Sequence, residues 1–303
     1  MNATIIIAAH NEAAVIGRCL SALLTDRQSG EFAVIVVPNG CSDETATIAR
    51  RHQSVRVIEI AIASKAAALN VGDAAANGFP RIYLDADIIA AAEDVRRLCR
   101  ALLGAPTTLA SAPMAAVPKR ELDLVGRPLL VRSYFNIQAR LPAFNDGLFG
   151  RGMIALSEEG RRRFDRFPDM IADDLFLDSL FASDEKLVVD TVTTTIATPL
   201  RTGDLIRRLG RVRRGNAAMR SAGRAGRVDA QVRNADRWSW LRDVVIPQPR
   251  LAPAAVIYVG ITVLAAVWAK RRPGSNREWG RDESTRDKSN ANHKLRDDGQ
   301  DPR

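Results

Sequence analysis

The sequence predicts an α/β fold, with a mostly parallel β-sheet covered by helices on both faces. Up to residue 103, four short apolar runs rich in β-branched residues alternate with segments of helical periodicity. The connections between them are short, which favours right-handed crossovers and parallel pairing. The chain has 303 residues, 46% of them hydrophobic, so it is long enough to bury a sizeable core.

The first four strand–helix units follow from the residue pattern alone. We expect strands over residues 4–9, 32–37, 55–60 and 82–84. Helices are expected over residues 15–24, from 42 onward, over 64–77 and over 93–103. Ser42 or Asp43 is the expected N-cap of the second helix, because short polar side chains accept hydrogen bonds from the free N–H groups there.

The alternation weakens after residue 103. We expect a strand over 108–115, a helix over 121–141 that Gly126 and Pro128 interrupt, and a glycine-flanked connection over 149–153. A short helix over 157–164, a helix that opens at residues 170–175 and a strand over 187–195 follow.

The C-terminal third differs in composition from the α/β domain predicted over residues 1–200. Residues 201–250 are predicted as a basic amphipathic helical segment, in which ten arginines between 201 and 233 oppose only Asp204 and Asp229. Residues 251–269 carry no charge and are about long enough to cross a bilayer. Residues 270–303 are polar and charged, and we expect a disordered tail.

Charge and cysteine content narrow the classes of partner. The net charge of +9 favours phosphate-bearing ligands, anionic membranes or nucleic acid. The three cysteines are widely spaced, so neither a disulfide framework nor a structural zinc site is expected, and a reducing compartment fits. The chain opens directly on a strand, so no signal peptide is expected.

Two carboxylates one residue apart, Asp85 and Asp87, follow the fourth expected strand. Alternate residues of an extended chain share a side, so both can reach one cation if the chain stays extended past Leu84. Hard divalent cations take carboxylate oxygens, and ligands of open α/β sheets gather at this end of the strands. A polar strand end, or Asp87 capping the next helix, explains the same residues without a ligand.

Five stretches, in this order, resemble the landmarks of family 2 glycosyltransferases with the GT-A fold. They are residues 7–12, 38–45, 65–70, 84–87 and 172–174. Each is weak alone, but the ordered set spans roughly residues 4 to 215 and is specific. The chain departs from the family pattern at Asn39, usually Asp, at Ala66, usually Gly, and at Gly215, where processive relatives carry Trp. The last departure argues against a cellulose-type processive polymerase.

The resemblance implies an inverting, metal-dependent transfer from a nucleotide sugar of UDP or GDP type, with Mn²⁺ or Mg²⁺ as cofactor. The residues it assigns to the donor are Ala9, Asn11, Glu12, Asp43, Lys65, Asp85 and Arg214. Asp87 is the surer metal ligand, and Asp85 contacts the ribose or the metal. Without a ligand, Asn11 and Asp43 read as helix caps, Lys65 as a solvated lysine and Arg214 as part of a basic face on anionic lipid.

The later acidic pair, Asp173 and Asp174, is the implied catalytic site. Inversion needs a base on the face of the sugar opposite the leaving group, to take the proton of the acceptor hydroxyl. We assign that base to Asp174 and an orienting role to Asp173. Carboxylates at the start of a helix are also favoured by its dipole, which needs no catalytic role.

The expected acceptor is a glycan or a lipid-linked molecule, in the synthesis of a bacterial cell envelope or exopolysaccharide. Residues 251–269 and the arginines before them predict attachment to the cytoplasmic face of the membrane, by a full crossing. A re-entrant or surface-lying helix, or docking of this segment onto the soluble domain, is the alternative. A nucleotidyltransferase is the alternative enzyme, but residues 8–12 lack its glycine-rich phosphate loop. An inactive relative that binds a partner is a third hypothesis. Nucleic-acid binding is not expected, because the arginine-rich stretch lacks aromatic residues for stacking.

Overall fold

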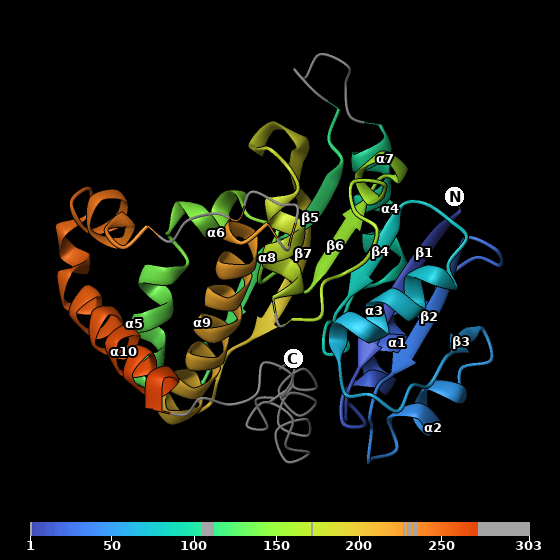
Figure 1. Ribbon diagram of the computed structural model, residues 1–303, viewed down its shortest axis with the longest axis horizontal. Coiled ribbons are helices and arrows are strands. Elements are labelled where there is room, and N and C mark those ends of the chain that lie inside the picture. Colours follow the sequence, from blue (N-terminus) through green and yellow to red (C-terminus); the bar gives the residue numbers. More distant parts are fainter. Residues whose placement is uncertain are drawn as a thin grey trace, which may run out of the picture.

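The computed structural model describes residues 2–104, 112–170, 172–226, 228, 232 and 236–271. One seven-stranded sheet has the order β3-β2-β1-β4-β6-β5-β7 (Figure 1). Its strands are β1 Ala3–Ala9, β2 Phe32–Pro38, β3 Val55–Val57, β4 Arg81–Leu84, β5 Ala115–Asp123, β6 Met153–Leu156 and β7 Lys186–Ala197. The helices that cover it are α1 Ile16–Leu24, α2 Thr45–Arg50, α3 Lys65–Ala74, α4 Ala92–Leu103, α5 Leu129–Gln138, α6 Pro142–Asp146, α7 Glu158–Arg161 and α8 Asp173–Ser179.

The mostly parallel α/β fold is confirmed. Strands β1 to β4 pair in parallel, as the alternation predicted, and β5 pairs in parallel with β7. Only β6 runs against its neighbours, β4 and β5. Because β6 separates them, β4 and β5 run in the same direction, and their carboxyl ends lie at one edge of the sheet.

Alternate residues of the central strands fill two cores, one on each face of the sheet. Ile5 and Ile7 point to the face covered by α1 and α4, and Ile6 and Ala8 to the face covered by α3 and α8. This two-sided burial explains why the strand at the start of the chain is apolar at every position except Thr4 rather than alternating with polar residues.

Several predicted boundaries were wrong. The helix expected over 121–141 begins as the end of β5, and helix starts only at Leu129, after the turn that Gly126 and Pro128 make. Strand β6 was not predicted, because its four residues are too few to show a period. Neither Ser42 nor Asp43 is the N-cap of α2, which is Glu44. The strand expected over 108–115 and the tail after residue 271 lie largely outside the described residues.

Helices α9 Thr202–Arg224 and α10 Ala252–Arg271 form a separate lobe with α5 (Figure 1). Their apolar side chains make a third core, in which the rings of Tyr134 and Tyr258 stack with centroids 5.1 Å apart. By length and composition alone, the stretch Pro249–Arg271, with a mean hydropathy of 2.1, is sufficient to cross a membrane.

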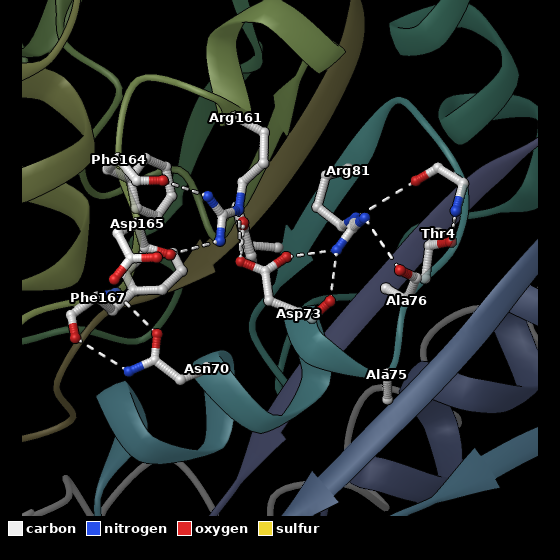
Figure 2. Close-up of polar contacts among 12 residues, drawn as sticks. Thr4, Asn70, Asp73, Ala75, Ala76, Arg81, Arg161, Phe164, Asp165 and Phe167 are labelled. Atoms are coloured by element: carbon white, nitrogen blue, oxygen red, sulfur yellow. Dashed lines mark hydrogen bonds and ion pairs between the residues drawn. The ribbon is translucent and has the colours of Figure 1, made fainter.

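A closed ionic cluster fixes helix α3 against the sheet (Figure 2). The Asp73 carboxylate accepts from Arg81 Nη1 at 2.5 Å, from Arg161 Nε at 2.7 Å and from the Tyr83 hydroxyl at 2.9 Å. The remaining N–H groups of Arg81 and Arg161 reach backbone carbonyls, including those of Ala76 and Phe164. The cluster therefore sets the position of α3, whose other end carries Lys65.

Candidate functional site

A cavity of about 240 Å³ opens at the carboxyl end of β4. Its charged and polar lining residues come from five segments of the chain: Lys65 of α3; Asp85 and Asp87 after β4; Arg151 before β6; Asp173 and Asp174 of α8; and Arg208 and Asn216 of α9. Residues separated by up to about 150 positions thus meet in one space, at the edge of the sheet where ligands of α/β folds bind.

Local structure explains how these side chains reach the cavity. Strand β4 ends at Leu84, and the Asp85 N–H is held by the Gly152 carbonyl at 2.8 Å. The Ser64 side chain caps α3, so Lys65 begins that helix. Ala172, at the start of α8, has φ 124°, a conformation that costs an alanine on the order of 1–3 kcal/mol and that is found mostly where function demands it.

Lys65 joins the two predicted acidic motifs. Its Nζ lies 2.8 Å from Asp85 Oδ1 and 2.8 Å from Asp173 Oδ2. Burial acts to lower the pKa of Lys65, but the carboxylates of Asp173 and Asp85 outweigh it and hold that pKa well above its usual range. Lys65 is therefore a permanent cation between the Asp-x-Asp stretch and α8.

Asp174 lies beside this bridge and has a different environment. Its Oδ2 accepts from the Gly150 N–H at 3.3 Å and its Oδ1 from the Leu175 N–H at 2.8 Å. Burial, and next the negative charge of Asp173, raise the pKa of Asp174 to about 6, although Lys65 opposes the shift. A carboxylate with a pKa near neutrality is suited to accept a proton.

The residues predicted to contact the nucleoside lie at the same edge of the sheet, at the ends of β1 and β2, and outside the lining of this cavity. Ala9 ends β1, and Glu12 is buried behind the loop. Asn11 has φ 52°, and its Oδ1 accepts from the Ser42 N–H at 2.7 Å. The Asp43 carboxylate accepts from the Ala13 N–H at 3.1 Å and the Thr45 N–H at 3.0 Å. The two loops are thus joined by polar contacts.

The structure separates Arg214 from the other predicted site residues. Its guanidinium lies over the Trp268 ring, 5.1 Å from the centroid, and it does not line the cavity. Arg208, which sequence reasoning did not single out, does line it. The two arginines are six positions apart and so lie on different faces of α9, which the basic composition of the segment could not reveal.

The side chains that could coordinate a metal ion are those of the Asp-x-Asp stretch. Asp85 and Asp87 both line the cavity, whereas the described part of the chain contains no group of three or more His, Cys, Asp or Glu residues placed for a metal ion. Hard cations such as Mg²⁺ are commonly held by one or two carboxylates and complete their shell with phosphate oxygens and water. The two aspartates therefore fit a cation that arrives with a diphosphate.

A mostly parallel sheet with an acidic cavity at its carboxyl edge agrees with the GT-A fold of glycosyltransferases. The model of the family "Glycosyl transferase family 2" matches residues 4–150, just under half of the chain, and identifies a glycosyltransferase domain there. No curated protein matches the chain. A mannosyltransferase from Pyrobaculum calidifontis, solved with GDP-Man and Mn²⁺, is 21% identical over 90% of this chain and 76% of its own, with a TM-score of 0.56. Residues 1–349 of TarS from S. aureus are 13% identical over 100% of this chain and 93% of theirs, with a TM-score of 0.50.

Proposed function

We propose that the chain moves a sugar from a nucleotide-diphosphate donor to an acceptor hydroxyl, with inversion at the anomeric carbon. One observation carries the proposal: a carboxylate whose pKa is raised to about 6, Asp174, shares a cavity with Lys65 and the Asp-x-Asp acids. A base and a site for a diphosphate are the two parts that a single displacement needs.

In the proposed step, the acceptor oxygen attacks the anomeric carbon while its proton passes to the Asp174 carboxylate. The bond from that carbon to the diphosphate oxygen breaks, and its electron pair leaves with the nucleoside diphosphate. Lys65, which already pairs with Asp85 and Asp173, supplies a fixed positive charge beside the leaving group. Asp173 holds Lys65 and so orients the charge rather than taking the proton.

Asp87 and Asp85 are the residues we assign to a divalent cation, Mn²⁺ or Mg²⁺. A bound cation neutralises the charge that develops on a departing diphosphate. The similar mannosyltransferase was solved with GDP-Man and Mn²⁺, which supports a nucleotide sugar as donor and a divalent ion as cofactor. We assign Ala9, Asn11, Glu12 and Asp43 to the nucleoside because they gather at the ends of β1 and β2.

We also propose that α10 attaches the enzyme to the cytoplasmic face of a membrane, where a nucleotide sugar is available. Val256, Val263 and Leu264 of α10 are exposed, although the opposite side of the helix packs on α5 and α9. An apolar outer face on a helix already docked to the protein fits a lipid surface.

The double variant Val263→Glu/Leu264→Glu should no longer sediment with the membrane fraction. The control variant Ile62→Glu, at another exposed apolar residue, should still sediment with it. Sedimentation of both variants would contradict the proposal.

A thermal-shift screen tests the donor proposal. UDP, GDP and their sugars are added with Mn²⁺, with Mg²⁺ or with EDTA, and the melting temperature is followed. One nucleotide should stabilise the protein, and only with metal, because a ligand that binds the folded state alone raises the free energy of unfolding by an amount that grows with the logarithm of its concentration over Kd. No stabilisation by any nucleotide, or equal stabilisation in EDTA, would contradict it.

A further inference from the structure

A second, larger cavity of about 990 Å³ lies along the C-terminal half of β5, against α5 and α6. Five cations line it, namely Lys119, Arg120, Arg132, Arg140 and Arg151, against three acids. Its volume is at the upper end of the range for small-molecule sites, so it is far larger than one small anion requires. The proposed donor and base, in the cavity after β4, leave this space unassigned.

Arg120 is the unusual residue of this cavity. Its guanidinium lies over the Phe144 ring, 4.5 Å from the centroid, and within the described residues it has neither a hydrogen-bond acceptor nor an ion-pair partner. Burial, and next the positive charges of Arg151 and Arg208, lower the pKa of Arg120 to about 10. A half-buried cation surrounded by other cations is costly without an anion.

Two other arginines that line the cavity, Arg151 and Arg140, already donate hydrogen bonds within the protein, and Arg132 lies exposed at its edge. Arg151 is buried and donates to four backbone carbonyls, those of Gly147, Pro118, Phe144 and Asn145. Arg140 donates to Asn136. Arg120 therefore differs from them in having its fork of N–H donors available to a ligand.

The larger cavity adjoins the proposed base through Gly150. A methyl group added to Gly150 would lie 3.4 Å from Arg120 Nη1, and the Gly150 N–H donates to Asp174 Oδ2 at 3.3 Å. Arg120 and Asp174 thus lie on the two sides of a single residue. Arg151 lines both cavities, so the space beside Arg120 and the space beside Asp174 are adjacent.

We propose that Arg120 binds a phosphate group of the acceptor, and that this cavity is the acceptor site of the transferase. The inference rests on the proposed function and adds the class of acceptor. A planar guanidinium pairs with phosphate oxygens through two parallel hydrogen bonds, which a neutral sugar does not offer. The apolar lining, which includes Leu122, Leu124 and Leu129, covers the organic part of such a molecule.

A titration in the presence of a filled donor site tests the proposal. The full chain is saturated with Mn²⁺ and GDP or UDP, whichever stabilises it, so that phosphate probes cannot occupy the donor site. Inorganic phosphate, dodecyl phosphate and the neutral dodecyl glucoside are then titrated by calorimetry. Arg120→Gln should weaken binding of the phosphate probes about tenfold or more, because it removes a charge-assisted hydrogen bond. Arg100→Gln, on the exposed surface of α4, should not.

The probes also distinguish the two sources of phosphate. Preference for dodecyl phosphate supports a lipid-linked acceptor, and equal binding of inorganic phosphate supports a soluble phosphorylated one. Unchanged affinity in Arg120→Gln, or equal binding of dodecyl glucoside, overturns the proposal. Arg120→Lys, which keeps the charge, should retain part of the affinity if loss in Arg120→Gln is not caused by misfolding. Failure of nucleotide to bind would instead count against the donor assignment. The phosphate probes are then titrated without nucleotide, and the comparison of Arg120→Gln with Arg100→Gln still tests the acceptor site.

Discussion

The two ends of helix α3 carry ionic clusters of similar composition and opposite accessibility. At its C-terminal end, the side chains of Asp73 and Arg81 are 4% and 5% exposed, and their polar atoms are bonded within the protein (Figure 2). At its N-terminal end, the side chains of Lys65 and Asp85 are 28% and 45% exposed and line a cavity. Both clusters tie α3 to β4 and to the segments after β6.

The difference shows how the same residue types serve structure in one place and ligand binding in another. A closed cluster contributes to stability because each buried charge is paired. Loss of one partner leaves the other charge buried and uncompensated, which is destabilising. An open cluster keeps charges at a solvent-accessible edge, where an incoming ion can replace existing partners. Asp174, whose pKa is raised to about 6, lies beside the open cluster, and the charges of Asp173, Lys65 and Asp85 act on it.

The largest expected effect is on catalysis beside the open cluster, at the N-terminal end of α3. Asp174→Asn should lower transfer by about 10²- to 10⁴-fold, because the amide cannot take a proton. Donor binding should persist. The same variant should melt no lower than the wild type at pH 8, since burial disfavours the charged carboxylate that it removes. Asp26→Asn, an exposed site far from the cavity, is the matched control; transfer retained in Asp174→Asn would contradict the assignment of the base.

At the closed end, Asp73→Asn should destabilise the fold without touching the cavity. It removes the charge that Arg81 and Arg161 share, and breaking a buried pair typically costs about 3–5 kcal/mol. Urea or thermal unfolding measures the loss, with Asp26→Asn again as control. Folded Asp73→Asn should still bind nucleotide; unchanged stability would show that the closed cluster is not structural.

The pH profile sharpens the comparison further. Transfer should fall as the pH drops through about 6, because the proposed base must be deprotonated. Lys65, Asp173 and Asp85 are the charges that act on Asp174, and Lys65 is the one that lowers its pKa. In Lys65→Met the acidic limb should therefore move to higher pH. A limb that stays in place in this variant would show that Lys65 does not act on the base.

The smallest expected effect distinguishes two arginines of α9. Arg208→Gln should weaken nucleotide binding about tenfold, because Arg208 lines the cavity. Arg214→Gln should change it by about threefold or less, because Arg214 lies on Trp268. Calorimetry measures the nucleotide affinity of the two variants. A larger loss of affinity in Arg214→Gln would show that Arg214, as the family resemblance implies, and not Arg208, contacts the donor.

The N-terminal half of the fold was predictable because its strands and helices repeat with a clear period. Residues 4–9 and 32–37 differ from β1 and β2 by one residue at one end. Strand β6 was missed because it is too short to show a period. Most of β5 was missed because its polar second half, from Lys119 to Asp123, is held in the sheet by pairing with β7, and pairing overrides local propensity. The bridge from Lys65 to Asp173 spans 108 positions (173 − 65), so no local pattern could show it.

Anomalous diffraction from crystals grown with Mn²⁺ and the stabilising nucleoside diphosphate would test the central claim most directly. The account predicts one manganese peak within about 2.2 Å of an Asp87 or Asp85 carboxylate oxygen, with the diphosphate beside Lys65. A peak elsewhere, or a nucleotide bound away from the open end of α3, would contradict it.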